Sequence, residues 1–229
     1  MLSIHNGLQG LRSAALMALM LGLSTAGAAI DERSVDNEDP EAVVSQVVSE
    51  ALDRLAEDID HLTADEDAGR AFFDEQILPW LDTDLMARFT MGRAARQASD
   101  EEIERFTRAL EGRVANLYTS SLERYAEEAR DFSQNGEIDL RTVSQKDDRA
   151  VISAQISSPE LDRTTLRIQL YRRDDRWRVF DVETSGVSML LVFRDALRSA
   201  ARDDGVSAMI AALEDGTVEV EEAWEEETN

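Results

Sequence analysis

The chain of 229 residues has no cysteine, three prolines, two histidines and, among its 24 basic residues, a single lysine, Lys146. Without cysteine there is no disulfide framework, no thiolate nucleophile and no cysteine-rich metal site, so packing alone has to hold the fold. His5 lies near the N-terminus, and His61 stands among acidic residues near the predicted end of a helix. We interpret His61 as a solvated residue that interacts with the helix dipole, in preference to a catalytic group.

Other signatures of catalysis are also missing. The sequence contains no GxSxG, no HExxH and no glycine-rich phosphate loop. Histidine is the commonest acid–base residue near neutral pH, and this chain offers almost none. We therefore expect no catalytic triad, no metal site and no cofactor.

Acidic residues outnumber basic ones by 48 to 24, which gives a formal net charge of −24. Such a chain does not bind nucleic acid by neutralising phosphates. We also expect bare anionic membranes to repel it, so that any membrane it meets would receive it through a partner protein. The charge is interpreted as adaptation to high salt, with a functional acidic docking face as the alternative.

The first 28 residues differ from the rest of the chain. Arg12 precedes an apolar run over residues 14–23, and Ala26 and Ala28 follow it as a small-x-small cleavage pattern. The apolar run is shorter than the roughly 20 residues of a membrane span. We predict a cleaved signal peptide at residues 1–28, with an uncleaved anchor as the alternative. The mature chain of 229 − 28 = 201 residues would be one domain outside the cytoplasm.

Residues 29–39 are polar and patternless, which predicts a flexible lead-in before the folded domain at 40–216. Asp39 is a suitable N-cap, and Pro40 suits the first helical position. Apolar residues then recur at three-to-four spacing as far as Ile59, which predicts an amphipathic helix.

Three more helices are predicted before the middle of the chain. Thr63 and Glu66 have the spacing of a capping box, and the helix that they open should stop or kink at Pro79. A short helix follows over residues 83–89. A second capping box, at residues 99 and 102, begins the longest helix, which is predicted to extend over roughly thirty residues. Its apolar stripe consists of Ile103, Phe106, Leu110, Val114, Leu117, Ser121 and Tyr125.

The periodicity changes to two after a turn at Asn135-Gly136. Apolar residues alternate with polar ones over three runs, centred on Ala154, Ile168 and Val179, and more weakly over residues 137–144. Acidic turns, Asp147-Asp148 and Asp174-Asp175, separate the runs. This pattern predicts a four-stranded antiparallel meander. Helical patterns return over 187–201 and 206–213, so the fold class is α+β with helices packed on one side of the sheet.

Two carboxylates on the last predicted strand are the remaining catalytic candidates. Asp181 and Glu183 are two residues apart and would share one face of the strand. A lone aspartate in a cupped sheet could serve as the base of a ketosteroid-isomerase-like enzyme. Asp181 could equally pair with a nearby arginine, such as Arg178 or Arg194. The acidic stretch at 217–229 matches no calcium loop and is predicted to be a solvated tail.

Two stretches carry a recognisable set of positions. The first is FDVETSGVSMLLVFRDAL, with Phe180, Asp181, Val182, Gly186, Val187, Ser188, Met189, Phe193 and Arg194. The second is ILPWLDTDLMARFTMGRAARQASDEEIERF, with Leu78, Pro79, Trp80, Gly92, Ala98, Ser99 and Phe106. At these positions the chain resembles the MlaC family of periplasmic phospholipid-transport proteins, also called the toluene-tolerance family. The resemblance extends in order over residues 40–214.

The resemblance implies a cupped, NTF2-like arrangement that encloses an apolar cavity for the acyl chains of a phospholipid. The protein would be a periplasmic monomer without stable membrane insertion. It would carry lipid between an outer-membrane lipoprotein complex and an inner-membrane ABC transporter with its MCE-domain subunit, which maintains outer-membrane lipid asymmetry. The residues expected to line the cavity are Leu78, Phe89, Phe106, Leu110, Val114, Ile152, Ala154, Ile156, Leu166, Ile168, Leu170, Val182, Val187 and Met189.

Pattern alone does not separate a cavity from a packed core. Besides the carrier, two alternatives therefore stay open: a small-molecule enzyme that uses Asp181, and a periplasmic adaptor with a packed core and no lipid.

Overall fold

The computed structural model describes residues 38–159, 161–203, 205–218 and 220. The predicted signal peptide, all but the last two residues of the lead-in, and most of the acidic tail lie outside the described residues. Within these ranges, no helix combines the length and apolar character that a bilayer span needs. The elements are α2 (Pro40–Ala64), α3 (Glu66–Phe72), η1 (Phe73–Ile77), η2 (Leu78–Trp80), α4 (Thr83–Met91), η3 (Ala94–Arg96), α5 (Asp100–Arg124), α6 (Ala126–Asn135), β1 (Glu137–Lys146), β2 (Arg149–Ser157), β3 (Thr164–Arg173), β4 (Arg176–Thr184), β5 (Val187–Ser188), α7 (Met189–Ala196), α8 (Arg198–Asp203) and α9 (Gly205–Glu214).

The first helix begins as the sequence predicts. The Asp39 side chain accepts a hydrogen bond from the Glu41 amide, at 3.0 Å, and Pro40 occupies the first turn of α2. The predicted capping box at Thr63 is wrong. Thr63 still belongs to α2 and its hydroxyl donates to the Ile59 carbonyl at 2.7 Å, whereas Asp65 caps α3.

The helix that Pro79 was expected to stop does not end abruptly. After α3 the backbone widens into a π-helix over η1 and then tightens into the 3-10 turn η2, which contains Pro79. Leu81 is extended, so the helical run ends there. The short predicted helix at 83–89 is α4, which extends to Met91 and is capped by Asp82.

The capping box before the long helix is confirmed. The Ser99 hydroxyl accepts from the Glu102 amide at 3.2 Å, and the Glu102 carboxylate accepts from the Ser99 amide at 2.8 Å. The helix is not continuous over roughly thirty residues, because Tyr125 leaves the helical conformation and divides α5 from α6. At 25 residues each, α5 and α2 are equally long.

The sheet has five strands in the order β1-β2-β3-β4-β5, and every neighbouring pair is antiparallel. The four predicted strands are confirmed. The fifth strand, β5, contains only Val187 and Ser188, which the helical pattern had assigned to the following helix. Acidic residues form the tight turns, since Asp147, Asp174 and Asp175 all adopt positive φ angles near 50–60°. Two bulges interrupt the pairing, at Val143 in β1 and at Phe180 in β4.

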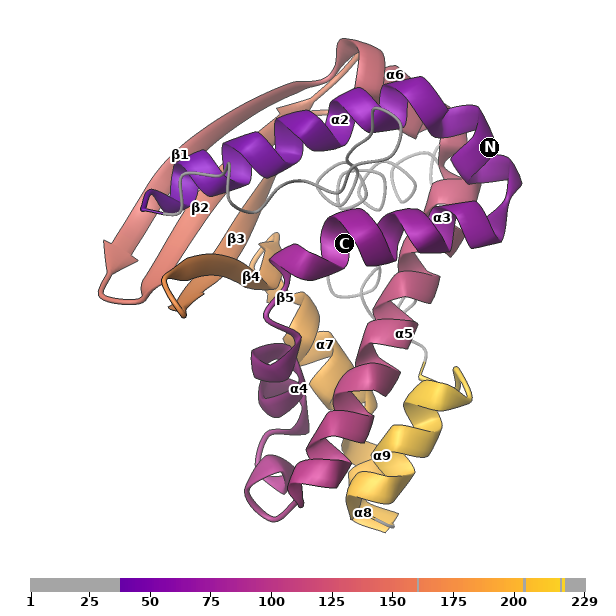
Figure 1. The fold of residues 1–229 in the computed structure, drawn as a ribbon, viewed down its shortest axis with the longest axis vertical. Helices are drawn as coiled ribbons and strands as arrows, with labels where there is room; N and C mark the ends of the chain where they lie inside the picture. The colour runs from indigo at the N-terminus through magenta and orange to yellow at the C-terminus, as the bar shows by residue number, and fades with distance from the viewer. Residues whose placement is uncertain (1–37, 160, 204, 219, 221–229) are drawn as a thin grey trace, which may run out of the picture.

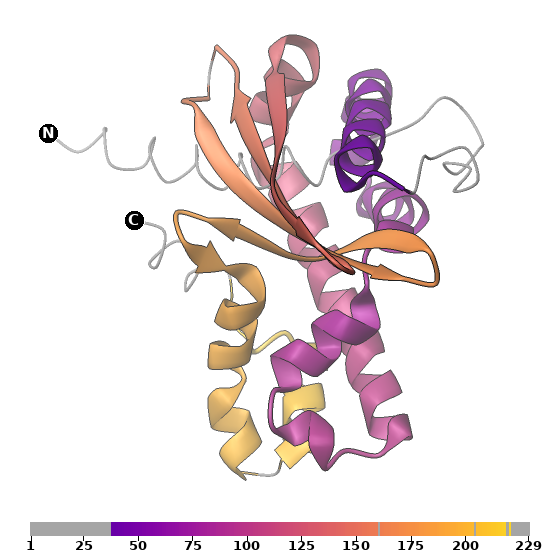
Figure 2. The same cartoon turned by 90° about the vertical axis from the view of Figure 1, so that its left-hand side faces the viewer.

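The helices α2 and α6 cover one face of the sheet, and the helices α4, α5, α7 and α9 form a group below it (Figures 1 and 2). The apolar positions of the central strands face α2, whereas the opposite face has polar residues such as Ser153, Gln155 and Arg167. This is the predicted α+β arrangement.

Candidate functional site: the apolar interior

The apolar interior is divided into two clusters of buried side chains. The first, called the sheet cluster, joins the inner face of β2–β4 to the N-terminal half of α2, with Trp80 and Phe132 at its sides. The second, called the helix cluster, is formed by the C-terminal half of α2 and by α3, α4, α5, α7 and α9. Helix α2 contributes residues to both clusters, and the segment around Trp80 packs against both. The two clusters are therefore adjacent parts of one fold.

The fourteen residues predicted to line a cavity are divided between these two clusters. The sheet cluster contains seven of them: Ile152, Ala154, Ile156, Leu166, Ile168, Leu170 and Val182. The helix cluster contains Phe106, Leu110, Val114 and Met189, with Leu78, Phe89 and Val187 packed against it. The structure therefore groups all fourteen with the apolar interior but not around one common space. Their contact with lipid stays a prediction.

A small apolar cavity lies where η1 and η2 meet α4 and α5. Its volume is about 10 Å³, which is room for about one water molecule. Three predicted residues, Leu78, Leu110 and Val114, meet at its wall. The other lining residues are Phe73, Leu81, Thr83, Met86 and Glu111. In this arrangement the cavity does not accommodate an acyl chain.

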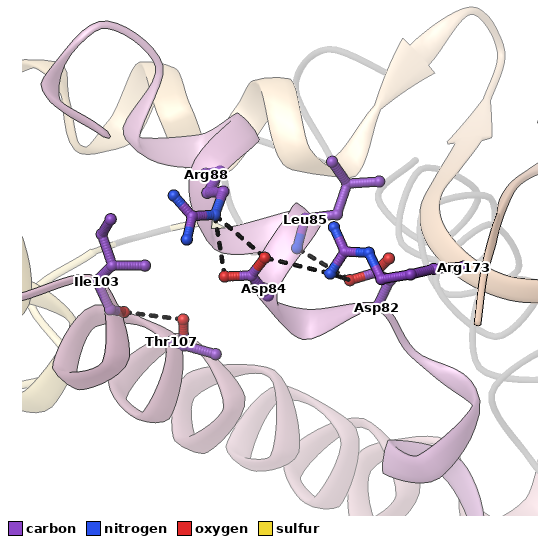
Figure 3. A network of polar contacts seen from close by, with 7 residues as sticks. All are labelled: Asp82, Asp84, Leu85, Arg88, Ile103, Thr107 and Arg173. Carbon is purple, nitrogen blue, oxygen red and sulfur yellow. Dashed lines mark hydrogen bonds and ion pairs between the residues drawn. The ribbon is translucent and has the colours of Figure 1, made fainter. Parts of the chain in front are cut away.

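A larger groove of about 440 Å³ lies between α4 and α5, and its character is polar. Its lining residues are Asp84, Arg88, Asp100, Ile103, Glu104, Thr107, Arg108 and Glu111. Figure 3 shows Asp84 between Arg88 and Arg173, at 3.0 Å and 3.3 Å. Partial burial alone would raise the pKa of Asp84, but hydrogen bonds and the positive charges of Arg88 and Arg173 lower it overall. Within the groove, Asp84 is therefore paired with Arg88, and Arg108 lies 4.0 Å from Glu104.

Asp181 is a buried carboxylate, 3% exposed, and it binds four donors of its own chain. It accepts hydrogen bonds from the Val182 amide at 2.9 Å, the Leu190 amide at 3.2 Å, the Ser188 hydroxyl at 2.6 Å and the Gln169 side chain at 3.3 Å. Burial raises the pKa of Asp181, although these hydrogen bonds oppose the change. The carboxylate therefore holds the first turn of α7 against β4.

The geometry favours a structural role for Asp181 over the catalytic alternative. Glu183 shares its strand face as predicted, and its carboxylate lies 3.9 Å from Arg167. The partners of Asp181 are amides and a hydroxyl, so the proposed pairing with Arg178 or Arg194 is wrong. Arg194 instead lies over a phenylalanine ring of α4. All four donors come from the folded chain, which leaves Asp181 poorly placed to take a proton from a substrate.

The sequence did not predict one junction between the helices and the sheet. The Asp82 amide donates to the Val179 carbonyl at 2.8 Å, and Leu81 and Val179 form an isolated parallel bridge. Arg173 reaches the Asp82 carboxylate at 3.5 Å, as Figure 3 shows. Asp82 caps α4 locally, but its partners in this junction lie about ninety residues further along the chain.

A family model described as "MlaC protein" matches residues 45–215, about three quarters of the chain. The chain belongs to the MlaC family. A solved structure with a similar fold is the phospholipid-binding protein from Ralstonia solanacearum, determined in complex with a phospholipid. The two structures superpose with a TM-score of 0.68 at 17% identity, over 80% of this chain and 98% of the other. A search of curated proteins finds no match.

The structure gives a reason for two of the matching motif residues, Gly92 and Arg194. Gly92 ends α4 with φ 57° and ψ −116°, a conformation that a residue with a side chain rarely adopts. The Arg194 side chain passes this glycine, since a Cβ there would lie 3.5 Å from its Cδ. Its guanidinium then lies over the Phe89 ring, 5.4 Å from the centroid. The motif therefore joins the end of α4 to α7.

Proposed function

We propose that this MlaC-family chain is a phospholipid carrier. It holds the acyl chains of the lipid in its apolar interior and moves the lipid between membranes. The observation that carries the proposal is the extent of that interior, which includes the inner face of β2–β4 and the facing sides of α2, α3, α4, α5, α7 and α9. Its sheet face is built from medium-sized side chains such as Ala154, Ile156 and Leu166, which acyl chains can replace as packing partners.

The physical need for such a carrier is large. Each buried methylene is worth about 0.8 kcal/mol, so an acyl chain with about 15 methylenes resists transfer into water by roughly 12 kcal/mol. A protein that covers the chains and leaves the headgroup in water removes this barrier without any catalytic residue. The absence of a triad or paired catalytic carboxylates among the described residues is compatible with that role.

The proposal includes a location and partners. The mature chain would act in the periplasm, and it would exchange lipid with an outer-membrane lipoprotein complex and with an inner-membrane ABC transporter through its MCE-domain subunit. Exported protein should then begin after residue 28, which N-terminal sequencing checks. Carrier loaded with labelled lipid should lose its cargo to vesicles that contain the MCE-domain complex, and should keep it with protein-free vesicles.

Extraction of the purified mature protein with organic solvent tests the central claim. We expect about one phospholipid molecule per chain, confirmed by native mass spectrometry, and uptake of labelled phospholipid from vesicles by protein stripped of lipid. A protein that is reproducibly lipid-free and also refuses lipid from vesicles would exclude the carrier function. A periplasmic adaptor would behave in that way, and would show neither lipid nor turnover.

The enzyme alternative is tested separately with Asp181→Asn. If the carrier function is correct, this variant folds and carries the wild-type amount of lipid. Loss of a measurable turnover in the variant, with its lipid content unchanged, would favour the enzyme.

A further inference from the structure

The segment over residues 78–82 lies between the two apolar clusters. Its side chains are shared between them: Leu78 and Leu81 pack against the helix cluster, whereas Trp80 belongs to the sheet cluster. The backbone here is a single 3-10 turn followed by an extended residue, without the hydrogen-bond ladder of a longer helix. This segment therefore contacts both apolar groups at the place where they meet.

Among the residues that the structure describes, a few polar contacts attach the segment to the sheet. They are the hydrogen bond from the Asp82 amide to the Val179 carbonyl, the bridge between Leu81 and Val179, and the contact of Arg173 with Asp82 and Asp84 (Figure 3). Val179 is next to the bulge at Phe180, where the pairing of β4 with β3 shifts by one residue. The attachment is thus made at a point where the sheet itself is irregular.

The closed arrangement also leaves polar atoms without partners. Within the part of the chain that the structure describes, the Gln76 Oε1 and the Asp82 Oδ2 are buried and accept no hydrogen bond. A buried acceptor without a donor lowers the stability of the state that contains it. The π-helix η1, which carries Gln76, leads directly into the segment, and π-helical turns inside helices are frequent at functional sites.

We propose that residues 78–82 form a latch that opens from β4 to admit acyl chains and closes to seal them from water. When the latch opens, the small cavity beside Leu78 and Leu81 joins the sheet cluster, and the two clusters become one apolar space. Closure restores the Asp82–Val179 hydrogen bond and the Arg173 contacts. This inference rests on the proposed phospholipid binding, and it adds the route by which lipid enters and leaves.

A disulfide across the latch provides the test. The chain has no cysteine, so Leu81→Cys combined with Val179→Cys introduces a single possible pair. Residues paired across neighbouring strands lie at a separation that a disulfide spans. We expect the oxidised variant to take up labelled phospholipid from phosphatidylcholine vesicles at least tenfold more slowly than wild type, and the reduced variant to regain the wild-type rate.

A matched control places the disulfide elsewhere in the sheet. Gln155 and Thr165 are Cα partners on the polar face of β2 and β3, far in sequence from the latch. The pair Gln155→Cys and Thr165→Cys should leave uptake unchanged in both redox states. If the oxidised latch variant takes up lipid as fast as this control, residues 78–82 do not need to move and the latch is disproved.

If the latch cysteines do not cross-link, a second variant still tests the latch. Arg173→Gln removes the contacts of Arg173 with Asp82 and with Asp84, so uptake and release should become several-fold faster than in wild type. Arg141→Gln is the control, because Arg141 pairs with Asp139 at 3.6 Å on an exposed part of β1. Equal rates for Arg173→Gln and Arg141→Gln would overturn the latch.

The two proposals fail in different ways. Wild-type protein that accepts no lipid under any condition refutes the carrier function, and with it the latch. Wild-type protein that accepts lipid, together with rates that are insensitive to both the cross-link and Arg173→Gln, refutes the latch alone.

Discussion

Replacement of Asp181 by alanine should cause the largest loss of stability of any single polar substitution on β4. The change removes the acceptor for four donors, of which the Val182 and Leu190 amides are buried backbone groups. Each donor left without a partner in the interior costs about 1–3 kcal/mol. Since Ser188 and Gln169 can reorient, we count mainly the two amides and expect a loss of about 3–5 kcal/mol.

Asp181→Asn separates the hydrogen bonds from the charge. The asparagine oxygen can still accept from the two amides, while its NH₂ group faces the Ser188 hydroxyl, which can rotate to accept. We therefore expect a loss of only about 1 kcal/mol. Glu183→Gln serves as the control on the same strand face. Its carboxylate is 3.9 Å from an exposed arginine, a type of pair that contributes about 0–1 kcal/mol.

Unfolding in urea, followed by tryptophan fluorescence, measures all three variants. Trp177 is buried on β4, close in sequence to the substitutions, and should report the loss of the sheet. The alanine variant should unfold at a clearly lower urea concentration than the asparagine variant, and Glu183→Gln should match wild type. If Asp181→Ala unfolds at the same urea concentration as Glu183→Gln, the carboxylate does not hold α7 and the structural interpretation of Asp181 is wrong.

The pKa of Asp181 predicts how this comparison changes with pH. Because burial raises its pKa, the folded state loses stability as the pH rises from about 4, the ordinary aspartate range, through the raised value. Asp181→Asn has no proton to lose. Its deficit relative to wild type should therefore be larger at pH 4 than at pH 7, and the opposite trend would show that the carboxylate is stabilised in its charged form.

Three further predictions concern other parts of the fold. The Glu41 carboxylate accepts from the Thr142 amide and hydroxyl, both at 2.6 Å, and these bonds lower its pKa. Its contribution to stability is present above about pH 4.3 and is lost as the pH falls through the lowered value, so the difference in melting temperature between wild type and Glu41→Gln should shrink on acidification. Gly92→Ala should lose about 1–3 kcal/mol through backbone strain, whereas Gly112→Ala, which meets no atom within 4 Å, should be neutral or slightly stabilising in thermal unfolding. Ile168→Trp should stay folded, with a melting temperature near that of lipid-free wild type and greatly reduced lipid content; outright unfolding would indicate a packed core, where overpacking costs about 1–3 kcal/mol or more.

Local signals in the sequence were sufficient for several element boundaries. The caps at Asp39 and Ser99 and the acidic turns between strands depend on interactions within a few residues, so their patterns are complete in the sequence. Thr63 shows the limit of such patterns. Thr63 and Asp65 are both good capping residues with acids three or fewer positions later, and only the observed hydrogen bonds decide between them.

Features that depend on distant contacts could not be predicted. The break at Tyr125, the two-residue strand β5 and the bulge at Phe180 are determined by what packs beside them. Periodicity identified the buried face of each helix and strand, which is why every predicted lining residue belongs to the apolar interior or packs against it. It could not show which other element covers that face, and so the division into two clusters was not foreseen.

The order of the strands also determines how the protein can fold. Every strand pairs with its neighbour in the chain, so each hairpin closes a short loop at little entropic cost. In contrast, Glu41 and Thr142 are 101 residues apart, and Trp177 donates to the Glu38 carbonyl across 139 residues. A chain that emerges N-terminus first therefore presents the apolar side of α2 long before its covering surface exists. We expect the hairpins to form early and α2 to dock last, which leaves this helix as the natural target for a chaperone during folding.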